Sequence, residues 1–306
     1  MTSSFLGPLS AFTASLTWAF ASTRFAEAAR REGAVRVGLL RALSASVLWL
    51  AALGLTQGLG ALRLVGGGRA LFLLGSILCS YALGDRLFFA AASRLGVSSA
   101  LSIATVYPLW AALYGTVVRN EPLGPVRVLG MLFCLLGVSA VLRMSRTAAP
   151  AQFEPRAAWA GAGLALLTSL FWAGNTVFLK LGSQGISLLQ ANALRYPFGV
   201  LLVLVQLPFA AKSAPESSAP AQRSSLFALA RKLSLPLLAD TGLGSVAFVY
   251  GIANTDLALG ATLSSLSPLV ALPIAVVLGT ERVTAGKVFA VCLTLLGVVL
   301  LVAYGR

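Results

Sequence analysis

The segment SLTWA at residues 15–19 recurs as SLFWA at residues 169–173, and this repetition decides the fold of the chain. The two segments are 154 residues apart, and the dipeptide Leu40-Arg41 recurs as Leu194-Arg195 at the same offset. Similarity at one constant offset is the signature of a duplicated structural unit. The sequence therefore predicts two repeats of one architecture.

A second group of matches continues through the rest of each repeat at an offset of 160 residues. Its members are Leu83-Gly84 with Leu243-Gly244, Pro108-Leu109 with Pro268-Leu269, Glu121 with Glu281, and Leu135-Leu136-Gly137 with Leu295-Leu296-Gly297. The offset grows from 154 to 160, so the second repeat contains six additional residues. They must enter between Tyr196 and Leu243, where the offset changes. Residues 212–225 lie there and are rich in Ser, Ala and Pro, so we predict a flexible connection.

The composition is that of a membrane protein. Of 306 residues, 58% are hydrophobic and only 10% are charged, and the mean hydropathy is +0.89. Soluble domains carry about 25% charged residues, and this chain could not cover a water-exposed surface with so few. Apolar runs near the roughly 20 residues that cross a bilayer predict spans at about 5–25, 35–57, 70–92, 98–117, 124–143, 158–180, 187–208, 234–254, 260–279 and 284–303.

The predicted fold is an all-α membrane protein of ten transmembrane helices in two inverted five-helix repeats. Five spans are an odd number, so the second repeat must enter the membrane from the opposite side. The repeats are expected at residues 5–143 and 158–303, with a linker at 144–157. Inverted repeats are the architecture of many secondary transporters. A duplicated bundle without a transport role remains the alternative.

Charge and cysteine usage exclude several other classes. The net charge is +14, but the Lys and Arg residues lie mostly between the apolar runs. They indicate topology and contacts with the lipid bilayer, and we expect no nucleic-acid partner. Cys79, Cys134 and Cys292 fall inside apolar runs, which favours buried side chains over disulfides or a metal site. The chain has no histidine, and we expect no metal and no cofactor.

Five ionisable side chains lie inside predicted spans, where each charge costs about 2.5–3.5 kcal/mol at a helix centre. They are Arg41, Asp85, Arg86, Arg195 and Asp240, and Arg86 is expected to reach a membrane interface because it points about 100° away from Asp85. Arg41 and Arg195 are repeat-equivalent, and Asp85 and Asp240 both lie on the third helix of a repeat. We expect two pseudo-symmetric ion pairs, or an arginine that binds a substrate carboxylate. The alternative for the arginines is that they extend to the lipid headgroups. Without histidine, the two aspartates are the candidates for proton coupling, although uncoupled transport fits equally well.

Aromatic and polar residues complete the predicted substrate-binding site, in which no residue is catalytic. Ser245 occupies the repeat position of Asp85, so the two halves differ chemically. For the two tryptophans, helix packing or a place at the membrane interface is the alternative. The further site residues are Trp18, Tyr81, Tyr107, Trp172, Asn175, Tyr196, Ser245 and Tyr250.

Two other sets of residues are predicted to be structural. Glu121 and Glu281 fall between the fourth and fifth helices of their repeats, where they would cap the next helix or accept local backbone hydrogen bonds. Gly130, Gly137 and Gly297 allow close helix approach, at either a repeat or a dimer interface. A monomer and a homodimer are both compatible with this pattern.

Each half resembles an EamA domain of the drug/metabolite transporter superfamily. The resemblance rests on the Trp of the first helix, the Arg of the second, the Pro of the fourth with the Glu beyond its end, and the Leu-Leu-Gly of the fifth. It implies alternating access and the export or exchange of small polar metabolites such as amino acids. Nucleotide sugars or sugar phosphates are an alternative substrate class, and a non-transporting scaffold or receptor is an alternative function. An enzyme is not expected, because the chain has no nucleophile–base or metal constellation.

The orientation of the chain is open between two arguments. The family resemblance implies that both termini lie in the cytoplasm. Fourteen of the 23 Lys and Arg residues fall in the connections on the opposite side from the termini, and the positive-inside rule then places the termini outside. We expect a multi-pass protein of the cell (inner) membrane in either case.

Overall fold

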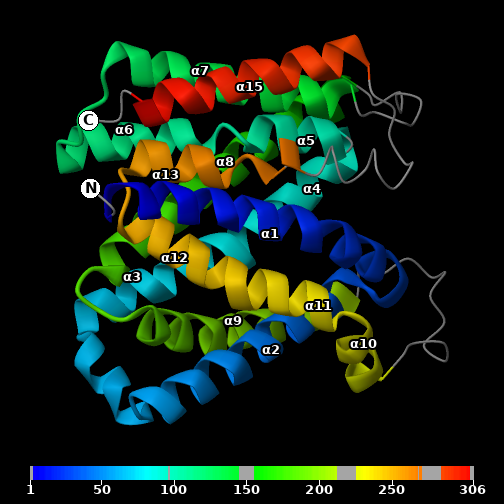
Figure 1. Ribbon diagram of the computed structural model, residues 1–306. Coiled ribbons are helices and arrows are strands. Elements are labelled where there is room, and N and C mark those ends of the chain that lie inside the picture. Colours follow the sequence, from blue (N-terminus) through cyan, green and yellow to red (C-terminus); the bar gives the residue numbers. More distant parts are fainter. Residues whose placement is uncertain are drawn as a thin grey trace.

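The computed structural model describes residues 3–95, 97–144, 155–211, 225–267, 269–270 and 284–303, and every regular element in these ranges is helical. In the first half the elements are α1 (Ser3–Glu32), α2 (Ala34–Thr56), η1 (Leu59–Val65), α3 (Gly67–Ile77), η2 (Leu78–Gly84), α4 (Asp85–Leu95), α5 (Val97–Ala104), α6 (Tyr107–Arg119) and α7 (Pro125–Met144). In the second half they are α8 (Pro155–Ser183), α9 (Leu188–Ala211), α10 (Leu226–Lys232), α11 (Ser234–Leu237), η4 (Leu238–Gly244), α12 (Ser245–Ala253), α13 (Leu257–Ser264) and α15 (Ala285–Ala303). Figure 1 shows them as one helical bundle.

Six of these helical stretches are long and apolar enough to cross a membrane, and two shorter apolar helices accompany them. The six are residues 35–56, 67–88, 159–183, 188–206, 234–253 and 285–303, and the shorter ones are 5–21 and 125–140. The protein is therefore an integral, multi-pass membrane protein. The predicted ninth span lies only partly within the described residues, so a count of ten helices stays a prediction. Residues 212–224 of the predicted flexible connection and residues 145–154 of the predicted linker also lie outside them.

The two π-helical segments η2 and η4 reveal the internal repeat in three dimensions. They begin at Leu78 and Leu238 and end at Gly84 and Gly244, so both bounds keep the 160-residue offset. The two end glycines allow a close approach to the first helix of the opposite half: a Cβ on Gly84 would lie 2.7 Å from the Trp172 ring, and one on Gly244 would lie 2.5 Å from Thr17 Oγ1. π-Helical turns are rare and occur frequently at functional sites.

The predicted fourth span is a broken helix. Residues 105–106 form a turn between α5 and α6, and Pro108 lies in the first turn of α6. Proline is tolerated there, because an N–H in the first turn of a helix has no partner within the helix. The corresponding residues 265–266 also form a turn, which directly follows α13. Both repeats thus interrupt the same helix at the same position, as the proline of the sequence motif suggests.

Helices α7 and α15 pack along one edge of the bundle, and α2 and α9 pack along the opposite edge (Figure 1). The predicted small residues lie in the first of these contacts. A Cβ on Gly130 would lie 2.8 Å from the Gly297 carbonyl oxygen, and one on Gly137 would lie 2.6 Å from the Ala290 oxygen. Of the two interfaces that the sequence allowed, these glycines therefore lie between the two halves of one chain.

The first helices of the two halves run in opposite directions. Near the beginning of α1, Gly7 lies against the backbone of Asn254, and near the end of α8, Lys180 donates a hydrogen bond to the Thr255 carbonyl oxygen. The start of α1 and the end of α8 therefore lie at the same end of the bundle. This is the relation expected of inverted repeats.

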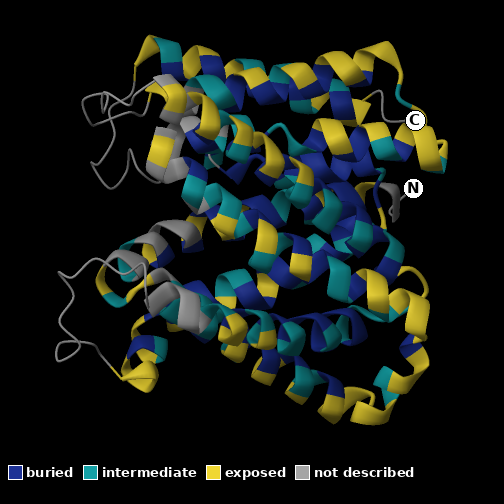
Figure 2. Ribbon diagram, turned by 180° about the vertical axis from the view of Figure 1, so that it is seen from behind, coloured by how far each residue is buried: buried dark blue, intermediate teal, exposed yellow. Residues whose placement is uncertain are grey.

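Burial separates the core of the bundle from its outer faces. Figure 2 shows buried residues concentrated inside the bundle and exposed residues on the outer helices. Many exposed side chains are apolar, as a lipid-facing surface requires. Cys292 is one of these exposed residues, so the prediction that all three cysteines are buried is wrong for Cys292 and right for Cys79 and Cys134. The apolar run alone could not distinguish a lipid-facing position from a core position.

Candidate functional site

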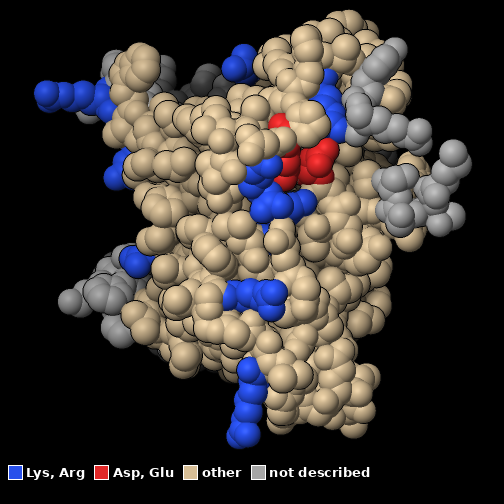
Figure 3. Space-filling view, turned by 90° about the vertical axis from the view of Figure 1, so that its left-hand side faces the viewer, with Lys and Arg blue, Asp and Glu red and all other residues tan. Residues whose placement is uncertain are grey.

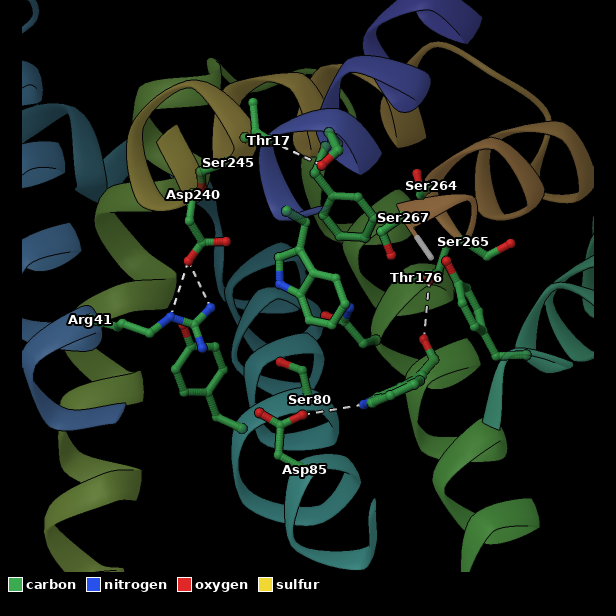
Figure 4. Close-up of a pocket in the computed structure, with 18 of the residues that line it drawn as sticks. Thr17, Arg41, Ser80, Asp85, Thr176, Asp240, Ser245, Ser264, Ser265 and Ser267 are labelled. Carbon is green, nitrogen blue, oxygen red and sulfur yellow. Dashed lines mark hydrogen bonds and ion pairs between the residues drawn. The ribbon is translucent and has the colours of Figure 1, made fainter. Parts of the chain in front are cut away.

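A cavity of about 230 Å³ lies in the middle of the bundle and is lined by both halves (Figure 4). The first half contributes residues of α1, α2, η2, α4, α5 and α6, and the second half contributes residues of α8, α9, η4, α12 and α13. The predicted site residues that line it are Trp18, Arg41, Tyr81, Asp85, Tyr107, Trp172, Asn175, Arg195, Tyr196, Asp240 and Ser245.

Arg41 forms an ion pair with Asp240 across the boundary between the halves. Nε and Nη2 of Arg41 donate to Asp240 Oδ2 at 3.1 and 2.7 Å, as the dashed lines in Figure 4 indicate. The guanidinium carbon also lies 4.8 Å from the centroid of the Phe25 ring and 5.8 Å from that of Tyr81, at cation–π distance. Arg41 is therefore held at the cavity and does not extend to the headgroups.

Arg195 has a different environment from its repeat counterpart. Its Nε donates to Ser76 Oγ at 2.9 Å, and its Nη2 donates to Asn175 Oδ1 at 3.3 Å. The residue is 5% exposed, so it too is directed inward. The expected pair of pseudo-symmetric ion pairs is therefore wrong: one arginine has a carboxylate partner from the opposite half, and the other is oriented by a hydroxyl and an amide.

Asp85 faces the cavity beside Trp172. The indole Nε1 of Trp172 donates to Asp85 Oδ1 at 3.3 Å. The Trp172 ring also lies 5.5 Å from the Phe88 ring and 6.3 Å from the Tyr107 ring, measured between centroids. Trp172 thus lines the cavity with a polar partner, and it also packs between helices, as one of the two alternatives for the tryptophans stated. Within the described residues, no Lys or Arg nitrogen lies in ion-pair distance of Asp85.

The repeat register explains why the two halves place different polar groups at the cavity. Ser80 occupies the repeat position of Asp240, and Ser245 occupies that of Asp85, so an aspartate and a serine are exchanged between two otherwise equivalent segments. All four residues line the cavity. Ser245 Oγ lies 2.7 Å from the hydroxyl oxygen of Tyr196, which links α12 to α9. Segment η4, with Asp240, and the residue that directly follows η2, Asp85, therefore place one carboxylate from each half at the cavity, at two non-equivalent positions.

Tyr250 is the one predicted site residue that does not line this cavity. It lines a separate groove near the α8–α9 connection, together with residues 183–188. The prediction rested on its residue type alone. Phe248 lines the cavity, and the step of two residues from Phe248 to Tyr250 turns Tyr250 about 200° around the helix, away from the cavity.

Several cavity residues were missed by the sequence reasoning, and most carry hydroxyl groups. They are Thr17, Ser80, Thr105, Thr176, Ser264, Ser265 and Ser267. Ser and Thr on helices commonly bond to a carbonyl of the preceding turn, and Thr176 does so with Trp172, so residue type alone gives no functional signal. The repeat register could have identified two of them, because Ser80 and Ser267 are the counterparts of the predicted site residues Asp240 and Tyr107.

Glu121 has a longer-range role than the predicted local cap. Its Oε2 accepts a hydrogen bond at 2.7 Å from the backbone N–H of Leu257, the first residue of α13 in the opposite half. The prediction that it caps the next helix is therefore wrong, because the helix that it caps is a distant one. Glu281, its repeat counterpart, lies outside the described residues. Among the residues that the structure describes, no group of three His, Cys, Asp or Glu side chains could hold a metal ion.

The fold and the cavity define a polytopic helical membrane protein with a central polar site between two related halves. The sequence profile of the EamA-like transporter family matches the chain twice, over residues 5–143 and 159–303. The chain therefore belongs to the EamA-like transporter family, within the drug/metabolite transporter superfamily.

One solved structure supports the same fold. One crystal structure, whose description names no function, is similar over 98% of both chains, with a TM-score of 0.73 and 22% sequence identity. A sodium–calcium exchanger aligns with 15% identity and a TM-score of 0.20, which carries no structural argument. No curated protein sequence matches the chain significantly.

Proposed function

We propose that the protein is a secondary transporter, an exporter or exchanger, of a small zwitterionic metabolite such as an amino acid. In this proposal ten transmembrane helices form two inverted five-helix repeats. Exchange of their conformations would open the cavity alternately to the two sides of the membrane. The cavity of about 230 Å³ suits a small solute.

The observation that carries the proposal is the separation of an arginine and an aspartate in the cavity wall. Arg195 is bonded to neutral groups, and Asp85 accepts from a neutral indole. Within the described residues, neither takes part in an ion pair. A guanidinium binds a carboxylate in bidentate geometry, and a carboxylate binds an ammonium group. A zwitterion would satisfy both charges, whereas a neutral solute would satisfy neither.

Substrates with phosphate groups are supported less well. Of the two arginines that line the cavity, Arg41 is already paired with Asp240, and no lysine is found among the described lining residues. A nucleotide sugar or sugar phosphate carries more negative charge than the single arginine Arg195 would neutralise. The alternatives of a scaffold or a receptor would leave the charged cavity without a role.

Proton coupling, if present, would act through Asp85. Asp240 accepts two hydrogen bonds from Arg41, while Asp85 accepts one from the neutral indole of Trp172. Uncoupled facilitation remains the competing mechanism. Transport driven by a pH gradient distinguishes them: coupling through Asp85 predicts that Asp85→Asn abolishes the response to the gradient, and an unchanged response would exclude Asp85 as the proton carrier.

The proposed substrate class is tested by uptake into proteoliposomes. A panel of amino acids and nucleosides is offered with and without an imposed pH gradient. Each transported amino acid is then competed with its amine and carboxylic-acid analogues, which lack one of the two charges. We expect competition by the zwitterion alone; competition by nucleosides or by singly charged analogues at equal concentration would reject the zwitterion proposal.

A further inference from the structure

One end of the bundle carries a cluster of charged residues that is separate from the cavity. Figure 3 shows this end, where acidic atoms gather in one place and basic atoms flank them. At its centre Glu121, in the α6–α7 connection, accepts a hydrogen bond at 2.7 Å from the N–H of Leu257 and one at 3.1 Å from Arg119 Nε. A carboxylate is stabilised at a helix N-terminus by the unpaired N–H groups and the helix dipole. The Glu121–Leu257 contact joins the first half of the chain to α13 of the second.

Two further contacts hold the same short connection between α12 and α13. The Lys180 ammonium group, at the end of α8, donates to the carbonyl oxygen of Thr255. Arg127, in the first turn of α7, forms an ion pair with Asp256 at 3.0 Å. Residues 255–257 are thus held in succession by α8, α7 and the α6–α7 connection. We call these three contacts the end latch.

The sequence around Glu121 directs its carboxylate back over α6. Asn120 ends α6 in the left-handed conformation, with φ 55°, which asparagine adopts more readily than most residues. The N–H of Glu121 then bonds to the Gly115 carbonyl oxygen at 3.0 Å. Gly115 leaves room for this arrangement, because a Cβ there would lie 2.7 Å from Glu121 Oε2 and 3.4 Å from the Leu257 Cβ.

The helix held by the end latch also forms part of the cavity wall. Ser264, the last residue of α13, lines the cavity, and the Tyr107 hydroxyl donates to the Ala261 carbonyl oxygen at 3.0 Å. Between the latch and the cavity, α13 is buried along residues 257–263. Two residues of the first half therefore hold α13: Glu121 at its first residue and Tyr107 near its middle.

We propose that Glu121 is a positioning residue of the transport cycle that holds α13 over this end of the cavity and must release Leu257 when the end opens. The proposal rests on the alternating access of the proposed function. The Glu121–Leu257 hydrogen bond is formed in the state described here and broken in the opposite state. Loss of the carboxylate shifts the population toward the state that is open at this end.

The test measures access to the cavity and needs no transport. Ser264→Cys serves as the reporter, in a background that carries Cys79→Ala, Cys134→Ala and Cys292→Ala. A membrane-impermeant thiol reagent is applied to proteoliposomes from each side. Leu64→Cys, in the α2–α3 connection at the latch end, reports which side is which, because Leu64 is 76% exposed. We expect Glu121→Ala to raise the labelling rate from the latch end at least about tenfold, the effect of losing a hydrogen bond to a charged group.

The conservative variant separates positioning from a general loss of structure. Glu121→Gln keeps an oxygen that can accept from Leu257, so it should label much closer to the parent rate than Glu121→Ala does. Glu27→Ala removes an exposed carboxylate paired with Arg31 and should leave labelling unchanged. Equal labelling of the parent and Glu121→Ala from the latch end would overturn the proposal. So would equal, raised labelling of the Ala and Gln variants.

A covalent lock provides an independent test if Glu121→Ala does not fold. The 3.4 Å between a Cβ on Gly115 and the Leu257 Cβ is close to the 3.5–4.5 Å that a disulfide requires. In Gly115→Cys/Leu257→Cys the new Cβ at residue 115 displaces the Glu121 carboxylate, and oxidation then joins α6 to α13 by a bond that cannot release. We expect oxidation to abolish substrate exchange and reduction to restore it, with Gly115→Cys alone insensitive to the oxidant. Full exchange in the oxidised, cross-linked protein would contradict release at this end.

Discussion

Asp240 of the second half is bound by Arg41 of the first: both hydrogen bonds of the guanidinium, at 3.1 and 2.7 Å, end on the same carboxylate oxygen. The side chains are only 21% and 10% exposed. Their repeat counterparts, Arg195 and Ser80, cannot form an equivalent ion pair, because Ser80 carries no charge. The pair therefore gives the two halves of the transporter unequal electrostatics.

Removing one partner of this pair should cost more stability than removing both. Arg41→Gln leaves the Asp240 carboxylate without its partner, and breaking a buried ion pair in this way costs about 3–5 kcal/mol. Arg41→Gln/Asp240→Asn leaves no unpaired charge and should recover most of the loss. The measurement is the midpoint of thermal unfolding in detergent. Arg31→Gln, in an exposed pair with Glu27, is the control and should cost about 0–1 kcal/mol. A double variant no more stable than Arg41→Gln would argue against this coupling.

Arg195 should bind the carboxylate of the substrate, so its replacement should raise the KM. Arg195→Lys keeps the charge but loses the planar fork that holds Ser76 and Asn175 and would bind a carboxylate. We expect the KM for a transported zwitterion to rise at least about tenfold. Ser76→Ala, which removes one orienting contact, should raise KM less. An unchanged KM in Arg195→Lys would remove Arg195 from the proposed site.

Trp172 should act on Asp85 through its indole N–H. Trp172→Phe retains a ring that can pack against Phe88 and Tyr107 but removes the donor to Asp85. We expect affinity for the zwitterion to fall about tenfold, since a hydrogen bond to a charged group contributes about 1.5–3 kcal/mol. Affinity for an analogue without an amino group should change much less. If both ligands lose affinity equally, Trp172 contributes packing alone.

The α7–α15 contact predicts where small residues are required. Gly130→Val and Gly137→Val insert side chains where a Cβ alone would lie 2.8 and 2.6 Å from backbone oxygens of α15. Overpacking of this kind costs about 1–3 kcal/mol or more. The matched control is Gly163→Val on α8, because no atom lies within 4 Å of a Cβ at Gly163. Equal unfolding midpoints for the Gly130 and Gly163 variants would show that this interface tolerates a larger side chain.

Much of the fold could be predicted from the sequence because lipid imposes simple rules. Apolar runs of bilayer length located the helices, and the constant register located the duplication. The π-helical segments were not predicted, and neither was the close approach of Trp172 to Gly84 and of Thr17 to Gly244 at their ends. Such contacts between halves leave no periodic signal in either segment.

The sequence predicts most of the charged residues of the candidate site, but it does not predict which of them form an ion pair. A charged residue inside an apolar span is costly, so its presence indicates a functional position. This applies to Arg41, Arg195, Asp85 and Asp240. Which charges meet depends on how the halves pack, and Arg41 reaches the opposite half. For Glu121 the sequence indicates only the nearest helix as a partner. Its actual partner, Leu257, is 136 residues away and is brought close by the packing of the two halves.

Counterflow in proteoliposomes of the purified protein tests the central claim most directly. Vesicles loaded with an unlabelled amino acid receive a trace of the labelled one outside, with Arg195→Ala vesicles as the control. The account predicts that label accumulates transiently inside the parent vesicles and does not do so in the Arg195→Ala vesicles. Absence of counterflow for every amino acid and nucleoside tested, by protein that is folded and reconstituted, would contradict the claim that this cavity transports a small solute.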